Sequence, residues 1–189
     1  MPIIPGIMAS EISGHLYVSS FYSIATFSGA SGGSWNVTNI PQTFTHLQLR
    51  FFQRETGTGG ATGGLKGVFI NINGDSTTTC YNHSIYTEGT TSYQSYSTDT
   101  RINFSGIQPV PSSSAIANAY GVMIMDILDY TNTNKYKVHR TFAGADLNGA
   151  GQVGMATGLY PSLNAITSLN IGSNESFTSA TSIALYGVI

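Results

Sequence analysis

Apolar and polar residues alternate most regularly over residues 45–54. Leu47, Leu49 and Phe51 fall on one side of an extended chain, and the residues between them fall on the other. Successive side chains of a β-strand point to opposite faces of the sheet, so this period of two predicts a long strand with one face in the core.

Residues 181–189 show a different pattern, because apolar side chains alternate onto both faces. One face would carry Ile183, Leu185 and Ile189, and the other Ala184, Tyr186 and Val188. Strands with two apolar faces are covered on both sides. A chain end frays unless it is held in a sheet, so we expect this strand inside the core or against a neighbouring subunit.

Residues 119–130 form a nearly continuous apolar run. A buried helix of this length is possible, but Gly121, the β-branched residues and the Asn/Thr turn at residues 131–134 favour a central strand. Residues 135–142 follow, where Tyr136, Val138 and Phe142 alternate with lysines and a histidine. The two runs predict a β-hairpin.

Further short runs predict the remaining strands, at residues 21–27, 35–40, 68–72, 81–86, 101–104, 153–160 and 166–171. A turn around Asp75 would join residues 68–72 and 81–86 as a hairpin. The Gly/Thr-rich residues 55–64 predict a mobile tip loop, and Tyr93 and Tyr96 fall in a Ser/Thr-rich connector. With about eleven strand candidates and no long amphipathic helix, the expected fold is an all-β, antiparallel β-sandwich of the jelly-roll kind.

The first residues predict an extended arm rather than a strand. Two prolines and a glycine keep this segment extended, and its apolar side chains have no obvious partner within it: Pro2, Ile3, Ile4, Pro5, Ile7 and Met8. We expect residues 1–16 to dock on another protein and residues 17–189 to form one sandwich domain. The alternative is a disordered start.

Composition narrows the set of partners. Charged residues make up only 8% of the 189 residues, the formal net charge is −2, and Lys and Arg together number seven. This balance argues against nucleic acid and against an anionic membrane as ligands. No apolar window reaches membrane-spanning length, and the N-terminus lacks the basic start and long apolar run of a signal peptide, so we expect a soluble product made in the cytoplasm.

Candidate chemical sites are sparse. Cys80 is the only cysteine, which excludes an intramolecular disulfide and is more typical of a small buried apolar residue than of a catalytic thiol. Asp75 with Asn71 and Asn73, and Asp146 with Asn148, space oxygen ligands as a calcium loop does. Neither set includes the distal bidentate carboxylate, so turn formation explains both better.

The remaining titratable residues predict neither zinc binding nor hydrolysis. The four histidines, His15, His46, His83 and His139, include no close pair. Asp126 and Asp129 are an odd number of residues apart, which on one strand sends them to opposite faces instead of making a carboxylate pair. We expect no catalytic residue, no metal and no cofactor.

Aromatic residues offer one candidate binding site. Tyr81, Tyr86, Tyr93 and Tyr96 lie among Asn, Gln and Ser residues, a mixture that can stack on sugar rings and hydrogen-bond to their hydroxyls. Packing of the same tyrosines across neighbouring strands is the alternative.

Several segments resemble a family of tailed-bacteriophage virion proteins. The similarity is carried by residues 4–16 (IPGIMASEISGHL), 40–50 (IPQTFTHLQLR) and 129–137 (DYTNTNKYK), and by the C-terminal Leu185-Tyr186-Gly187-Val188-Ile189. Members of the family often end in a Ser-rich turn followed by Leu-Tyr-Gly-Ile, from which this chain differs by Val188. The resemblance spans nearly the whole chain and implies a non-enzymatic, trimeric β-sandwich with no catalytic residues.

Two functions remain open from the sequence. In the first, the chain is a structural protein of the virion exterior, such as a capsid decoration or a tail-tip component, attached through its N-terminal arm to other capsid or tail proteins. In the second, it is a carbohydrate-binding module of a tail fibre that recognises a glycan on the host surface. In both we expect a homotrimer, because a charge-poor chain without disulfides gains robustness by burying sheet faces between subunits.

Overall fold

The computed structural model describes residues 20–29, 32–61, 63–104 and 106–189, and the predicted docking arm at residues 1–16 lies outside this part of the chain. Fourteen β-strands are defined within it, and the described residues contain no helix. The strands are β1 (Phe21–Ser28), β2 (Ser34–Val37), β3 (His46–Gln53), β4 (Leu65–Lys66), β5 (Val68–Ile72), β6 (Cys80–Glu88), β7 (Thr91–Asp99), β8 (Ile102–Asn103), β9 (Val110–Pro111), β10 (Gly121–Leu128), β11 (Lys137–Asp146), β12 (Gly151–Tyr160), β13 (Leu169–Ser173) and β14 (Ser182–Val188).

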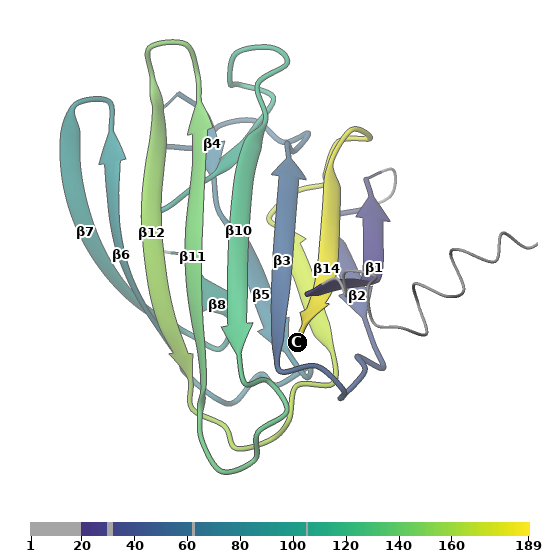
Figure 1. Cartoon of the computed structure of the whole chain (residues 1–189). Coiled ribbons are helices and arrows are strands. Elements are labelled where there is room, and N and C mark those ends of the chain that lie inside the picture. Colours follow the sequence, from purple (N-terminus) through teal and green to yellow (C-terminus); the bar gives the residue numbers. More distant parts are fainter. Residues whose placement is uncertain (1–19, 30–31, 62, 105) are drawn as a thin grey trace, which may run out of the picture.

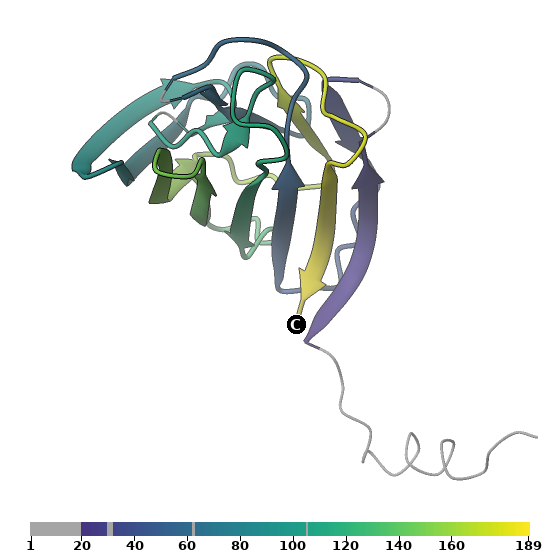
Figure 2. The same ribbon diagram turned by 90° about the horizontal axis from the view of Figure 1, so that it is seen from above.

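Two antiparallel sheets face each other across one core (Figures 1 and 2). The larger sheet has eight strands in the order β1-β14-β3-β10-β11-β12-β6-β7, and the smaller has four in the order β2-β13-β5-β8. A two-stranded ribbon of β4 and β9 completes the set. The predicted all-β, antiparallel β-sandwich is confirmed.

Strand order identifies a jelly roll inside this sandwich. Going inward from the two ends of the chain, β1 lies beside β14, β2 beside β13, β3 beside β10 and β5 beside β8. A chain folded back on itself and then wrapped over two sheets gives this arrangement. The other long strands, β6, β7, β11 and β12, extend the larger sheet beyond β10.

Apolar side chains from the facing sheets fill the core. Leu47, Leu49 and Phe51 of β3 are buried, as their alternation predicts, and Ile70 of β5 and Ile171 of β13 are buried on the opposite sheet. Each buried aliphatic side chain contributes about 1.5–3 kcal/mol relative to an exposed one. This shared core fixes which face of the larger sheet points inward and which points outward.

One predicted hairpin is confirmed and the other is wrong. β10 and β11 pair in register around the turn after Leu128. The runs on either side of Asp75 do not pair, because β5 belongs to the smaller sheet and β6 to the larger. The turn itself forms, with Asn73 and Gly74 at positive φ, but Asp75 then accepts hydrogen bonds from Thr77 and Thr78 and the chain crosses to the other sheet.

Two segments differ from the sequence predictions. Tyr93 and Tyr96 lie in β7, an edge strand paired along its length with β6, and not in a connector. The described residues between 55 and 64 are anchored and do not form a free tip, since Glu55 is fully buried and its carboxylate lies 2.7 Å from Nζ of Lys66. Backbone groups of this segment also bond to Ser112, Ser113 and Ser114.

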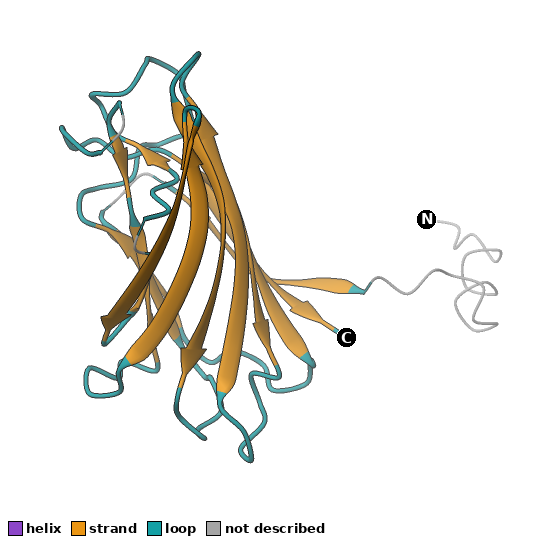
Figure 3. Cartoon of the chain, turned by 90° about the vertical axis from the view of Figure 1, so that its left-hand side faces the viewer, coloured by secondary structure: helices purple, strands orange, loops and turns teal. Residues whose placement is uncertain are grey.

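The C-terminal strand β14 lies inside the larger sheet, between β1 and β3. Its inward side chains Ile183 and Leu185 are fully buried. Its outward side chains Ala184, Tyr186 and Val188 are only half-buried in the single chain. Both β1 and β14 reach the same end of the sheet, so the described chain begins close to the place where it ends (Figure 3).

Candidate functional site

The outer face of the larger sheet carries an unusual number of apolar side chains. In-register pairing places Ile124, Phe142, Met155 and Ile85 in one row across β10, β11, β12 and β6. The next row toward the start of β10 holds Phe52, Val122 and Val153. Directly opposite residues of antiparallel strands lie on the same face, so the two rows form one surface.

We call these seven residues the apolar band: Phe52, Ile85, Val122, Ile124, Phe142, Val153 and Met155. All are exposed, with Ile85 62%, Met155 56% and Phe142 54% accessible. The ring of Tyr120 stacks on Phe52 with centroids 4.5 Å apart and extends the surface further. Side chains of this type normally lie in a protein core.

A polar row borders the apolar band on the same face. It runs through Gln48, Asp126, Arg140, Thr157 and His83 to Tyr96. Nε of Arg140 lies 2.8 Å from a carboxylate oxygen of Asp126, whose second oxygen accepts a hydrogen bond from Gln48. The rings of His83 and Tyr96 lie 4.7 Å apart. Arg50 of β3 lies opposite Ile124 at the end of the first apolar row, with its guanidinium over the rings of Phe21 and Tyr186. The face therefore has a mostly apolar half and a half that contains a paired acid and base.

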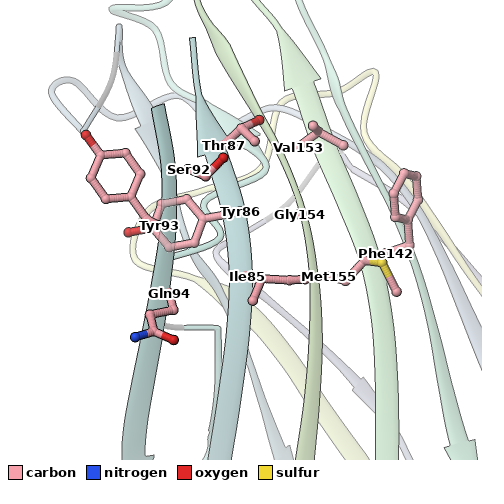
Figure 4. A pocket seen from close by; sticks show the side chains of 10 residues that line it. All are labelled: Ile85, Tyr86, Thr87, Ser92, Tyr93, Gln94, Phe142, Val153, Gly154 and Met155. Carbon is pink, nitrogen blue, oxygen red and sulfur yellow. The ribbon is translucent and has the colours of Figure 1, made fainter. Parts of the chain in front are cut away.

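Shallow hollows lie between the side-chain rows of this face. One of about 700 Å³ is bounded by Ile85, Phe142, Val153 and Met155, and Figure 4 shows these side chains across β6, β12 and β11. A second of about 730 Å³ lies between Ile85, Tyr96 and Arg140, and a third of about 790 Å³ lies beside Val122 and Phe142. Ridges and depressions thus alternate along one surface.

Strand β11 places its side chains opposite to what their polarity suggests. Val138 and Phe142 point outward and are exposed, whereas Lys137 and His139 are buried at 1% and 2% accessibility. Nζ of Lys137 lies in a cage of backbone oxygens and donates to Asn132, Lys135, Ser162 and Leu163 at 2.5–3.3 Å. Burial lowers the pKa of this lysine.

His139 points into the core and bonds to a neighbouring strand. Its Nε2 lies 2.8 Å from Oδ1 of Asn82, and its ring meets Phe104 edge-on. Burial lowers the pKa of His139 to about 4, because a charged imidazolium is poorly solvated there. The inward-facing side of β11 is thus held by specific polar contacts, which leaves Val138 and Phe142 on the outer surface.

The four candidate tyrosines do not form one cluster. Tyr81 and Tyr96 lie on the outer face, in the same rows as Leu159 and His83. Tyr86 and Tyr93 lie on the opposite face, where their rings stack with centroids 5.4 Å apart. A Cβ added at Gly106 would lie 2.3 Å from the ring of Tyr86, so that pair is packed against its own chain.

The candidate calcium loops are hydrogen-bonded turns. One carboxylate oxygen of Asp75 accepts from Thr77 and Thr78, and the other accepts from the hydroxyl of Tyr160 at 2.9 Å. The threonine donors lower the pKa of Asp75 strongly. Asp146 accepts from the backbone N–H of Asn148 at 2.9 Å, in the geometry of an Asx turn. These oxygens already have protein donors.

The remaining titratable candidates are dispersed. Asp126 lies on the polar row of the outer face, whereas Asp129 follows β10 in a turn and pairs with Lys135. Cys80 is buried, and burial raises the pKa of its thiol to about 11. His46 contacts Asp129, and His15 lies outside the described residues. No three His, Cys, Asp or Glu side chains gather in a metal-binding group within the described residues.

The described part of the chain contains no helix that is long and apolar enough to cross a membrane. Comparison with protein-family models, with curated proteins and with solved structures finds no match for this chain.

Proposed function

We propose that this chain is a non-enzymatic structural protein of the exterior of a tailed-bacteriophage virion. It acts as an assembly subunit, such as a capsid decoration or a tail-tip component, and its N-terminal arm attaches it to other capsid or tail proteins. The virion assignment rests on the sequence resemblance, and the role as a subunit is supported by the apolar band on the larger sheet.

The apolar band supports an assembly role because of its size. The exposed fractions of its seven residues amount to roughly 640 Å² of surface, and the largest apolar patch of a typical soluble monomer is about 300–600 Å². Contiguous apolar surface of this extent marks a protein–protein contact. Its size therefore favours a chain that works as part of a larger assembly.

The place where the arm joins the domain supports its role in attachment. Residue 20 leads directly into β1, which is an edge strand of the larger sheet. Phe21 at the start of β1 pairs with Val188 near the C-terminus. The edge position of β1 keeps the start of the described chain at the outside of the sandwich, which supports a role of the preceding segment in attachment.

Particle incorporation tests the proposal. Deleting residues 1–9 should leave a domain with an unchanged melting temperature that no longer incorporates into virions. A full-length chain with Ser10→Ala and Ser13→Ala is the matched control and should incorporate normally. Labelled antibody against the intact particle should locate the protein on the capsid or the tail. Normal incorporation of the truncated chain would rule out attachment through the arm.

Glycan binding is the second candidate function, favoured by the second hollow of the outer face. His83 and Tyr96 form an aromatic wall beside Gln94, Arg140 and Thr157. An aromatic face beside amide, hydroxyl and guanidinium groups can stack on a sugar ring and bond to its hydroxyls. Tyr81 lies in the adjoining depression, which also includes His83 and Tyr96.

A glycan array compares the two faces of the β6–β7 hairpin. If the hollow binds sugar, Tyr96→Ala should abolish binding that the wild-type chain shows. Tyr93→Ala, which removes a comparably exposed tyrosine from the opposite face, should retain it. Equal loss in both variants, or no binding by the wild-type chain, would contradict this candidate.

A further inference from the structure

We propose that the apolar band is the surface through which copies of this chain contact one another in a homotrimer. This inference deepens the proposed structural role, on which it rests, since it assigns the subunit contact to the outer face of β3, β10, β11, β12 and β6. It does not depend on which part of the virion holds the protein.

The size of the apolar band matches what such a contact needs. Stable protein–protein interfaces bury about 800 Å² on each partner, and the band alone exposes roughly 640 Å². Its residues are β-branched, aromatic or thioether side chains that pack like the inner face of a sandwich. Covering them with a second sheet at about 10 Å would give the outer face the environment of the inner one.

The shape of the surface favours an identical partner. Phe142 borders two hollows and Met155 borders two, so these side chains stand as ridges between depressions. A second copy presents the same ridges and the same depressions. Side chains of one copy can therefore fill the hollows of another without any further complementary surface.

Charge also favours an identical partner. All seven residues of the band are uncharged. The charged residue in register with them is Arg50, opposite Ile124 at the end of one row, and its guanidinium lies over the rings of Phe21 and Tyr186. The adjacent row holds Asp126 paired with Arg140, which nearly cancel. A lipid surface fits less well, because these charges lie on the same face and the described rows beside the band contain no basic cluster. The band thus favours another copy of the chain.

Topology places four of the seven band residues on strands outside the jelly roll. Ile85, Phe142, Val153 and Met155 lie on β6, β11 and β12, which extend the larger sheet beyond the jelly-roll strands. The number of subunits rests on the sequence resemblance, and the structure contributes the face through which they meet. The polar row beside the band, where the side chain of Arg140 is 71% exposed, suits the rim of such a contact.

Light scattering on the full-length protein tests the assignment. The wild-type chain should have three times the monomer mass at micromolar concentration. Phe142→Thr with Met155→Thr should reduce the mass threefold, to that of a monomer. The matched control, Ile116→Thr with Leu163→Thr, removes two comparably exposed apolar side chains from loops and should remain trimeric.

A second measurement covers the case in which the band variant fails to fold. Met155→Cys in the otherwise wild-type chain, treated with a short bifunctional thiol reagent, should yield covalent multimers, and Cys80 does not compete because it is buried. Leu163→Cys should yield none. A monomeric or dimeric wild-type protein, a trimeric band variant, or equal cross-linking at both positions would overturn the proposal.

The outcomes also separate this inference from the virion assignment. A trimer that is absent from phage particles would contradict the proposed function and leave the interface intact. A monomer that incorporates into particles would contradict the interface and leave the proposed function intact.

Discussion

Glu55 and Lys66 form an ion pair beneath the surface of the domain. The carboxylate of Glu55 is fully buried, one of its oxygens lies 2.7 Å from Nζ of Lys66, and the other accepts a hydrogen bond from Ser173. Lys66 belongs to the β4–β9 ribbon and Ser173 to β13 of the smaller sheet. This carboxylate therefore joins residues 55–66 to the sandwich.

We expect Lys66→Met to destabilise the domain by about 3 kcal/mol, because it leaves a buried carboxylate without its counter-ion. Glu55→Gln in the same chain should recover part of the loss, since it removes the uncompensated charge. Lys135→Met, which breaks a solvent-exposed pair with Asp129, should cost less than about 1 kcal/mol. Urea unfolding of these variants and the wild type measures the differences, and equal losses in both single lysine variants would contradict the prediction.

Acid should destabilise the domain through His139. Burial lowers the pKa of this histidine from 6.5 to about 4, so the folded state favours the neutral imidazole. As the pH falls below about 6.5, the unfolded chain binds a proton that the folded chain does not. The contribution of neutral His139 to the free energy of unfolding is fully present above about pH 6.5, decreases below it, and levels off below about pH 4. The loss should reach up to about 3 kcal/mol.

Chemical unfolding between pH 7 and pH 4 checks this dependence. His139→Gln removes the titrating group, retains a side chain that can bond to Asn82, and should flatten the profile over this interval. A variant whose stability falls as steeply as that of the wild type would show that another group is responsible.

The alternation of the sequence predicts most of the strands and the sandwich class. It succeeds where one face is apolar and the other polar, as in residues 45–54, because the burial of Leu47, Leu49 and Phe51 then decides which face turns inward. It is less informative for β10, where Val122 and Met123 are both apolar and either face could be the core. There the partner strands decide the orientation.

Strand β11 shows why the outer surface could not be read from polarity alone. Lys137 and His139 are buried because backbone carbonyls and Asn82 bond to them, and several of those partners come from distant parts of the chain. The exposed Val138 and Phe142 then belong to a face that polarity assigns to the core. Such a reversal follows from tertiary contacts that no local pattern contains.

The separation of the tyrosines, in contrast, had a local signal. Tyr81 and Tyr86 are five residues apart and Tyr93 and Tyr96 three apart, and odd spacings alternate faces on a strand. The Ser-rich sequence of β7 has no buried apolar face and therefore lacks the alternation that predicts a strand. The sequence thus predicts a connector at residues 93 and 96, to which the spacing rule for strands does not apply.

Gly158 lies where a side chain would disturb the contact between His139 and Asn82. A Cβ there would lie 2.2 Å from Nε2 of His139 and 2.6 Å from Oδ1 of Asn82, with the backbone oxygen of Tyr81 at 2.4 Å. We expect Gly158→Ala to cost about 1–3 kcal/mol through this overlap. Gly67→Ala is the control, because no atom lies within 4 Å of its added Cβ, and it should be neutral or slightly stabilising. Thermal unfolding of both variants tests this prediction, and similar melting temperatures of the two variants would contradict the steric argument.

The two faces of β14 should differ sharply in their contribution to stability. Leu185 is fully buried and lies between Ala25 of β1 and Leu49 of β3, so truncation to alanine leaves a cavity in the middle of the core. Leu185→Ala should cost about 3 kcal/mol. Ala184→Ser, the neighbouring residue on the outer face, should change the free energy of unfolding by less than about 0.5 kcal/mol in the isolated subunit. Urea titration of each variant under conditions that keep the protein monomeric measures both values. A loss at residue 184 as large as that at residue 185 would mean that the outer face of β14 is also buried in the single chain, contrary to its half-exposed side chains.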